Sequence, residues 1–234
     1  MIRLSIVIPS NNHELTAYSR ILQAFSWAGP RVEIVVLDTS GSAAKAAFLR
    51  GVVRENCRLI VAPPGGRHTD WSEALAAAQG DFVYFVSDDD ICFDRAMAIL
   101  PGVIESVAAD SAVIGIAAPT LIETGQGAQA FAYPNIDASD PLVRLSGYLS
   151  FDGPNVLLLS PIRRATMAWA FETVRSKPFA FPFDDRISSL LYLMGGKFAR
   201  MARLMSVYDA TSADAASRAD VALYERSHLD PATN

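Results

Sequence analysis

Apolar and β-branched residues form short continuous runs through the first half of the chain, and segments with helical spacing separate these runs. The runs cover residues 4–8, 32–37, 58–62 and 82–87. Runs of this length with few polar positions are typical of strands that are buried on both faces. Strands that alternate with helices form a parallel sheet covered by helices on both sides. The pattern therefore predicts a three-layer α/β fold with a central, mostly parallel sheet.

Three helices are predicted between these strands. Apolar side chains at helical spacing place the first at residues 15–25, and a turn of small residues at 39–42 precedes the second, which ends near residue 53. The third helix follows the loop at 63–66 and reaches residue 79. Thr69 or Asp70 is its expected N-cap, and Gly80 is its expected stop.

The second half of the chain has a less regular pattern. Asp94 is expected to cap a helix with apolar positions up to Val107, and residues 112–118 are expected to form a strand. Residues 123–139 are rich in glycine, alanine and polar residues and predict a long loop. The remaining expectations are a strand at 156–159, a helix start at Ser160-Pro161, a helix opened by Asp184-Asp185 and a polar tail after residue 211.

Polar side chains follow three of the predicted strands at the point where each strand ends. Ser10, Asn11 and Asn12 follow the first, Asp38 ends the second, and three consecutive aspartates at 88–90 follow the fourth. Because parallel strands share one carboxyl-terminal edge, and ligands of open α/β sheets bind at that edge, we expect these side chains to form a site.

Asp88, Asp89 and Asp90 are the strongest candidates for metal binding. A hard cation such as Mg²⁺ or Mn²⁺ prefers carboxylate oxygens, and one or two suffice when substrate phosphates complete the shell. In extended backbone the first and third of these acids point to one side and the second points to the other. The alternative is a solvated turn in which Asp90 or Asp94 caps the next helix.

Three other positions have both a binding and a purely structural interpretation. Asp38 can accept a hydrogen bond from a ribose or a base N–H, or bond its own turn backbone. Gly66 and Arg67 can contact a phosphate, and a solvated loop arginine is the alternative. The paired acids Asp184-Asp185 can cap their helix or supply a general base.

Composition excludes several classes of protein. Of 234 residues, 51% are hydrophobic and 19% are charged, and the net charge of −5 with no basic block argues against a nucleic-acid partner. No apolar stretch is long enough to span a membrane, and the N-terminus runs straight into a strand pattern, without a cleavable signal. Cys57 and Cys92 lack metal-ligand spacing and suit a reducing compartment, which favours the cytoplasm. The mean hydropathy of +0.22 hints at peripheral membrane association or a homo-oligomer.

Four segments in order resemble the GT-A-fold glycosyltransferases of family 2, and the resemblance extends over roughly residues 3–200. These segments are Leu4-Ser5-Ile6-Val7-Ile8-Pro9-Ser10, Val35-Val36-Leu37-Asp38-Thr39-Ser40, Gly80 through Asp90, and Phe183-Asp184-Asp185. The resemblance implies a single GT-A domain over residues 1–234. Its nucleotide-sugar part would cover about residues 1–95 and its acceptor part about 96–210, followed by the polar tail.

The family implies an inverting, metal-assisted transfer from a nucleotide-diphosphate sugar to a glycan or lipid-linked hydroxyl, as in polysaccharide biosynthesis, with a UDP-sugar favoured over a GDP- or dTDP-sugar. By this resemblance Pro9, Ser10 and Asn11 lie along the nucleotide, and Asp38 contacts its base or ribose. The acids at 88–90 resemble the DXD motif, which holds Mn²⁺ or Mg²⁺ and the donor diphosphate. Asp185 resembles the catalytic base.

Three positions depart from the family pattern. Ser87 stands where many members have an acid, so the metal ligand is open among the three aspartates that follow. Asp184 replaces a glutamate, and Ser72-Glu73 replaces a common asparagine. A non-catalytic nucleotide-sugar-binding or assembly protein is therefore the alternative function. A nucleotidyltransferase is disfavoured, because no glycine-rich phosphate loop follows the first strand.

Overall fold

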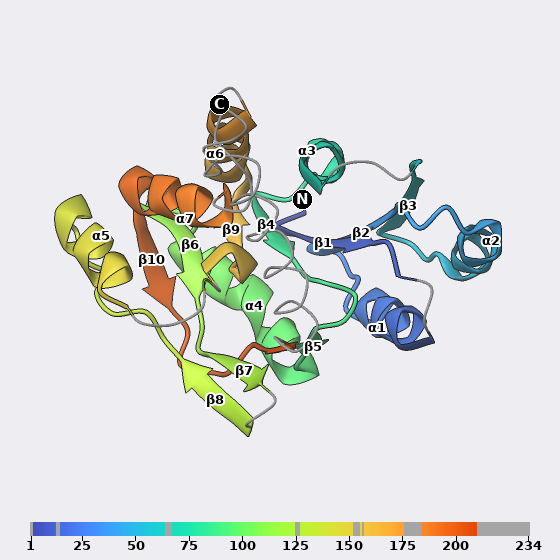
Figure 1. Ribbon diagram of the computed structural model, residues 1–234, viewed down its shortest axis with the longest axis horizontal. Helices are drawn as coiled ribbons and strands as arrows, with labels where there is room; N and C mark the ends of the chain where they lie inside the picture. The colour runs from blue at the N-terminus through green and yellow to red at the C-terminus, as the bar shows by residue number, and fades with distance from the viewer. Residues whose placement is uncertain are drawn as a thin grey trace, which may run out of the picture.

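The computed structural model describes residues 2–12, 15–63, 67–124, 127–151, 155, 157–175 and 184–209. Its main element is a seven-stranded sheet with the strand order β10-β6-β9-β4-β1-β2-β3 (Figure 1). All neighbouring strands are parallel except β9, which runs antiparallel to both β4 and β6. The strands are β1 (Leu4–Ser10), β2 (Val32–Asp38), β3 (Cys57–Val61), β4 (Phe82–Phe85), β6 (Val113–Ala117), β9 (Ile162–Arg163) and β10 (Lys197–Arg200).

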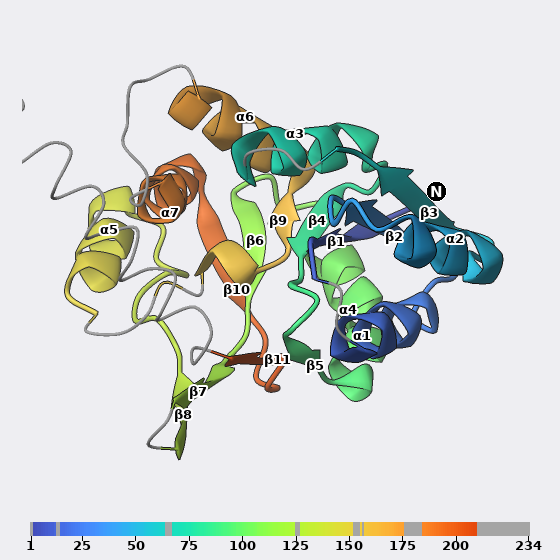
Figure 2. The ribbon, with the colours of Figure 1, turned by 45° about the vertical axis from the view of Figure 1, so that its right-hand side comes forward.

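Helices cover both faces of this sheet, as the alternating pattern predicts. On one face α3, α5, α6 and α7 contribute to a single apolar cluster, and on the other face α1, α2 and α4 contribute to a second cluster. Figure 2 shows α3 and α6 on one side of the sheet and α1 and α4 on the other. The helices are α1 (Leu15–Phe25), α2 (Ala43–Val52), α3 (Arg67–Ala77), α4 (Asp94–Val107), α5 (Pro141–Leu149), α6 (Arg164–Arg175) and α7 (Asp184–Gly195).

The central strand β1 shows why both helix layers are needed. Its side chains alternate between the two faces, so Leu4, Ile6 and Ile8 belong to one apolar cluster and Val7 to the other. Its neighbours β2 and β4 divide their side chains between the same two clusters. A strand that is apolar on both faces is stable only when both faces are covered, and this fixes the site-bearing strands rigidly in the centre of the molecule.

A second, four-stranded sheet lies beyond the carboxyl-terminal edge of the first, with the order β5-β11-β7-β8 (Figure 1, bottom). It consists of β5 (Ile91–Cys92), β11 (Ser206–Asp209), β7 (Thr120–Thr124) and β8 (Gly127–Phe131). Strand β5 directly follows the three aspartates, and β11 pairs with it in antiparallel orientation. The second half of the chain therefore returns to brace the acidic segment.

Two predictions for the second half are wrong. The expected loop at 123–139 contains β8, which pairs with β7 as a hairpin. The expected strand at 156–159 gives way to a 3₁₀ turn, Leu157–Leu159, within the described part. A short apolar run does not distinguish a strand from a helical turn, and a strand of small residues held by backbone hydrogen bonds leaves no apolar signal.

The expected helix boundaries need correction as well. Strand β9 separates Ser160-Pro161 from α6, which begins at Arg164. Helix α3 begins at Arg67, before the expected caps Thr69 and Asp70. The N-cap of α4 is Phe93 and makes no side-chain cap bond, so Asp94 is not a cap. The Asp94 carboxylate instead accepts hydrogen bonds from Gln23 Nε2 at 3.0 Å and Trp27 Nε1 at 2.7 Å.

Gly80 allows β4 to begin directly against β1. A Cβ atom at this position would lie 2.6 Å from the backbone nitrogen of Ser5 and 2.8 Å from the carbonyl carbon of Leu4. The Gly80 N–H donates to Ser5 Oγ at 2.8 Å, which ties the two strands at their amino ends. No side chain fits here without displacing a backbone atom of the central strand.

Gly80→Ala is therefore expected to lower the free energy of unfolding by about 1–3 kcal/mol, because the added methyl overpacks a rigid backbone contact. Gly51→Ala in α2 is the matched control, because a Cβ there meets nothing within 4 Å and the substitution favours the helix. Urea unfolding of both variants measures the difference. Equal midpoints would contradict the close approach of the two strands.

Candidate active site

The carboxyl ends of β1, β2 and β4 lie side by side at the edge of the main sheet. Ser10 and Asp38 are direct register partners on β1 and β2, and Val7 of β1 pairs with Phe85 at the end of β4. Asp88 follows three residues after that end, and its side chain reaches back to Ser10. The structure thus brings together Ser10, Asp38 and Asp88, and all three are buried.

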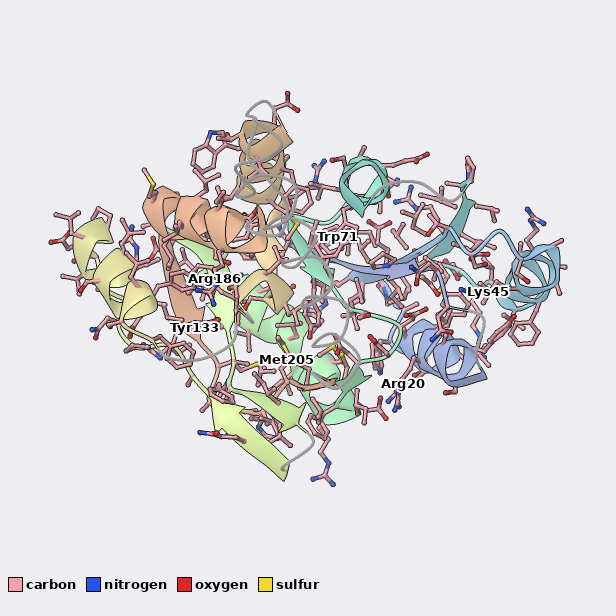
Figure 3. All side chains as sticks on the ribbon, viewed as in Figure 1. Arg20, Lys45, Trp71, Tyr133, Arg186 and Met205 are labelled. Carbon is pink, nitrogen blue, oxygen red and sulfur yellow. The ribbon has the colours of Figure 1, made fainter. Side chains whose placement is uncertain are left out.

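A lysine that the sequence analysis did not select lies at the centre of this cluster. Lys45 of α2 is fully buried, and its Nζ donates to Ser10 Oγ at 2.5 Å and to the carbonyl oxygen of Asn12 at 2.8 Å. It also forms an ion pair with Asp38 Oδ1 at 3.3 Å. Figure 3 shows Lys45 pointing from α2 toward the sheet. The available signal was its position on the inner face of the helix, beside Ala46 and Leu49.

Asp38 makes the turn bond of its structural interpretation, and its other oxygen has no partner in the described part of the chain. Its Oδ1 accepts the backbone N–H of Ser40 at 3.1 Å, which is the turn bond of the structural alternative. Its Oδ2 is buried and has no hydrogen-bond partner among the described residues. A buried carboxylate oxygen without a donor is costly, so this atom is suited to receive an N–H or O–H from a ligand.

The acidic segment has the alternation that the sequence predicts. Asp88 and Asp90 are each 5% exposed, whereas Asp89 points to solvent. Because Phe93 occupies the N-cap of α4, the interpretation of these acids as helix caps is wrong. Burial raises the pKa of Asp88, and the hydrogen bond from Ser10 and the charge of Lys45 oppose that rise. The fold therefore keeps a carboxylate where it is electrostatically unfavourable, which is typical of functional sites.

The acids suit a cation that a ligand also coordinates, rather than a cage made by the protein alone. In the part of the chain that the structure describes, no group of three or more acidic, histidine or cysteine side chains lies close enough to hold a metal ion. Asp88 and Asp90 share the buried side of the segment. One or two carboxylates together with diphosphate oxygens satisfy Mg²⁺ or Mn²⁺. A site at Asp88, Asp89 or Asp90 for a metal ion that a ligand also coordinates stays a prediction.

The other predicted site residues lie either beside this cluster or outside the part of the chain that the structure describes. Pro9 is part of β1, and Asn11 is exposed just beyond it, so both lie beside the cluster. Gly66 and the side chains of Arg67, Asp184 and Asp185 lie outside the described residues. The backbone of α7 begins at Asp184, and this helix packs against α6 and α5.

Cys92 borders the acidic segment without taking part in its chemistry. It is buried, and burial raises the pKa of its thiol to about 12. The thiol therefore stays protonated and cannot act as a nucleophile at neutral pH. Trp71 likewise packs within the core, stacked on Phe85 with ring centroids 4.8 Å apart.

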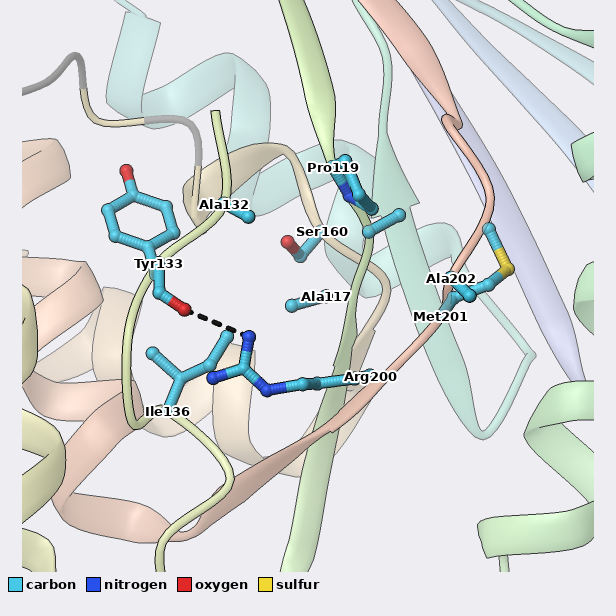
Figure 4. A pocket seen from close by; sticks show the side chains of 10 residues that line it. Ala117, Pro119, Ala132, Tyr133, Ile136, Ser160, Arg200, Met201 and Ala202 are labelled. Atoms are coloured by element: carbon cyan, nitrogen blue, oxygen red, sulfur yellow. Dashed lines mark hydrogen bonds between the residues drawn. The ribbon is translucent and has the colours of Figure 1, made fainter. Parts of the chain in front are cut away.

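A cavity of about 270 Å³ lies at the carboxyl ends of β6 and β10 (Figure 4). Its walls are mainly apolar, and Ser160 and Arg200 add polar groups. Ser160 is 5% exposed, and Arg200 donates to the carbonyl oxygen of Tyr133 at 3.0 Å and to Asp137 at 2.8 Å. Strand β9 lies between β4 and β6, and Ser160 comes just before it. The cavity that Ser160 lines therefore lies beside the sheet edge that carries the three aspartates. The cavity leaves no signal in the sequence, because its lining comes from four separate segments.

Comparisons with known proteins give the family of this chain and the class of its fold. The profile described as glycosyl transferase family 2 matches residues 5–132. The solved structure of residues 1–349 of TarS from S. aureus is similar to this chain, with a TM-score of 0.59 and 16% identity. The alignment covers 89% of this chain and 61% of that one. The same fragment in complex with UDP-GlcNAc gives a TM-score of 0.60, 15% identity and coverages of 89% and 58%.

A mannosyltransferase, PcManGT from Pyrobaculum calidifontis, in complex with GDP-Man and Mn²⁺, is similar with a TM-score of 0.53 and 16% identity, covering 88% of this chain and 56% of that one. The chain thus spans 56–61% of the length of these three structures. A search of curated protein sequences finds no match. The family profile covers more than half of the chain, and the GT-A fold expected from the sequence is confirmed. The chain belongs to glycosyl transferase family 2.

The buried charge of Asp88 is expected to cost stability at neutral pH. Its pKa is raised above the unfolded value of 3.8, so the folded state binds a proton more tightly than the unfolded state does. Stability from this group is therefore present at low pH and is lost as the pH rises through the folded pKa. Asp88→Asn should raise the Tm at pH 7, and the gain should shrink as the pH falls through that range.

Asp89→Asn is the matched control, because Asp89 is exposed and its neutralisation should leave the Tm unchanged at both ends of the pH range. Calorimetric scans of the ligand-free protein in steps from pH 7 to pH 4 make the comparison. A Tm of Asp88→Asn below that of the unsubstituted protein at pH 7 would refute the unfavourable burial of this carboxylate.

Proposed function

We propose that this protein transfers a sugar from a nucleotide-diphosphate sugar to a hydroxyl acceptor. The observation that carries the proposal is the convergence of Ser10, Asp38 and Asp88 at the carboxyl ends of three adjacent strands in a family 2 fold. This edge is where open α/β sheets bind ligands. The structural neighbours in complex with UDP-GlcNAc and GDP-Man support a nucleotide sugar as the donor.

The donor would lie along this edge with its nucleoside toward β2 and its diphosphate toward the acids. Asp38 Oδ2 would accept a hydrogen bond from the base or ribose, and the segment from Pro9 to Asn11 would line the nucleotide. A UDP-sugar is favoured over a GDP- or dTDP-sugar. Gly66 and Arg67 would approach the phosphates. Mn²⁺ or Mg²⁺, held by one or two of the acids at 88–90, would offset the charge of the leaving diphosphate.

Asp185 is the proposed general base of an inverting reaction. Its carboxylate would accept the proton of the acceptor hydroxyl while that oxygen attacks the anomeric carbon and the nucleoside diphosphate leaves. Asp184 would stand beside it at the first turn of α7. The positive end of the macrodipole of α7 would also stabilise a negatively charged carboxylate at this position.

The cavity at the carboxyl ends of β6 and β10 is the proposed acceptor side of the site. It belongs to residues 96–210, the part that the family pattern assigns to the acceptor, and its mainly apolar walls suit the ring face of a glycan or an apolar aglycone. The hydroxyl of Ser160 and the guanidinium of Arg200 provide hydrogen bonds at its edge. The acceptor would be a glycan or a lipid-linked sugar.

The proposed location of the enzyme is the cytoplasm, at the inner face of a membrane. Among the described residues no helix is long and apolar enough to cross a bilayer. Helix α5 carries Leu142, Val143 and Leu149 with exposed fractions of 72%, 42% and 69%. Such an apolar surface supports peripheral membrane contact or a homo-oligomer.

Replacement of the proposed base tests the mechanism. Asp185→Asn should keep the affinity for UDP with Mn²⁺ within about threefold and lower the transfer rate by at least about a hundredfold, the size of effect typical of a general base. Titration calorimetry measures binding, and release of UDP from a panel of UDP-sugars measures turnover. Asp110→Asn, at an exposed surface ion pair, is the control and should change neither quantity.

Unchanged turnover of Asp185→Asn would refute the assignment of the base. Binding of UDP with Mn²⁺ by the unsubstituted protein without turnover of any sugar and acceptor would instead support the non-catalytic alternative. No binding of any nucleotide diphosphate would refute the proposed function as a whole.

Filling the cavity tests the acceptor side. Ala132→Leu places a larger side chain on the cavity wall and should raise the KM for the acceptor about tenfold or more while leaving the Kd for UDP unchanged. Ala130→Leu, an exposed position of β8 outside the cavity lining, is the matched control. Equal acceptor KM values for the two variants would place the acceptor elsewhere.

A further inference from the structure

The fully buried ammonium of Lys45 has an unusual place in this fold. Helix α2 begins after its N-cap Ser42, whose hydroxyl accepts the backbone N–H of Lys45 at 3.2 Å, and the inner face of the helix continues with Ala46 and Leu49. Burying an unpaired charge in such a position is strongly unfavourable. A lysine there indicates that its partners require it.

The geometry of Lys45 fixes the direction of a chain of hydrogen bonds. Its three N–H groups have three acceptors: Ser10 Oγ, the carbonyl oxygen of Asn12 and Asp38 Oδ1. An ammonium group only donates, so the Ser10 hydroxyl accepts from Lys45 and must give its own proton to another group. That group is Asp88, whose Oδ2 lies within hydrogen-bond distance. Lys45 therefore orients Ser10 and, through it, Asp88.

The same ammonium determines which oxygen of Asp38 is available. Oδ1 receives both Lys45 and the Ser40 N–H, so the carboxylate is held in one rotamer. Oδ2 is then the only oxygen left to accept a donor, and no described residue supplies one. Without Lys45 only the Ser40 N–H would remain to select between the two oxygens of the carboxylate.

We propose that Lys45 is a positioning residue for the nucleoside half of the donor. It does not touch the donor, because protein acceptors take all three of its N–H groups. It holds Asp38 so that Oδ2 faces the nucleoside, and it holds Ser10 so that the nucleoside and diphosphate ends of the site keep one relative geometry. This inference rests on the proposed function, and it names a residue outside the four segments that resemble the family.

The test uses uridine, a probe that has no phosphate and therefore reports on the nucleoside end alone. Lys45→Met keeps an unbranched side chain that is one atom shorter and removes the charge. Because it leaves Asp38 buried without its cation, it is accompanied by Asp38→Asn and by the double variant, which carries neither charge. The Kd for uridine and for UDP with Mn²⁺ is measured by titration calorimetry, and thermal melting confirms that each variant is folded.

Each single variant should bind uridine about tenfold or more weakly than the unsubstituted protein. The double variant should bind no more weakly than Asp38→Asn does, since Lys45 acts through that carboxylate. A purely structural lysine would not produce this non-additive cycle. Lys197→Met, at an exposed ion pair with Asp110, should bind uridine normally.

Two results would overturn the inference alone. One is a folded Lys45→Met variant that binds uridine like the unsubstituted protein. The other is a double variant weakened by the product of the two single effects. Failure of the unsubstituted protein to bind UDP with Mn²⁺ would overturn the proposed function, and the inference with it.

Discussion

One buried ammonium group holds together the strand ends on which the site depends. Lys45 contacts Ser10, Asn12 and Asp38, which belong to the ends of two neighbouring strands, and Ser10 links it to the acidic segment after a third. The charges of Asp38 and Asp88 are tolerated in the interior because this cation lies between them. Removal of any one member leaves a buried polar group without its partner, so the cluster is maintained as a unit.

The fold supplies this cluster with a rigid base. Strands β1, β2 and β4 are mainly apolar on both faces. Their carboxyl ends carry the polar side chains of the candidate site, and a separate buried pair, Ser5 and Glu33, lies near their amino ends. Gly80 brings β4 against β1 at the opposite end, so both strands start from a fixed contact. The polar side chains of the candidate site therefore lie at one edge of the sheet, where the small sheet and the cavity of Figure 4 border it.

Most of the fold could be predicted from the sequence where apolar runs are long and separated by helices. The parallel strands β1 to β4 follow from apolar runs whose only stable location is the core. The alternation that separates Asp88 and Asp90 from Asp89 follows from extended backbone, and the structure adds that the side of Asp88 and Asp90 is the buried one. Strand β8 could not be predicted, because its small and polar residues leave no apolar run. The short antiparallel β9 could not be predicted either, because pairing with the distant strands β4 and β6 holds it. Lys45 was missed for a related reason. A lysine in a helix is ordinarily solvated, and only the distant partners Ser10 and Asp38 show that this one is not.

The pairing of β5 with β11 has a consequence for the order of assembly. Ser206 lies opposite Cys92, so the strand that follows the acids finds its partner more than a hundred residues later. On a ribosome the central strands can pair early, while the acidic segment waits until β11 has left the exit tunnel. The central strands of this protein can therefore pair before the edge that carries the acids is complete, and the acidic segment lacks its β11 partner until nearly all of the described sequence has emerged.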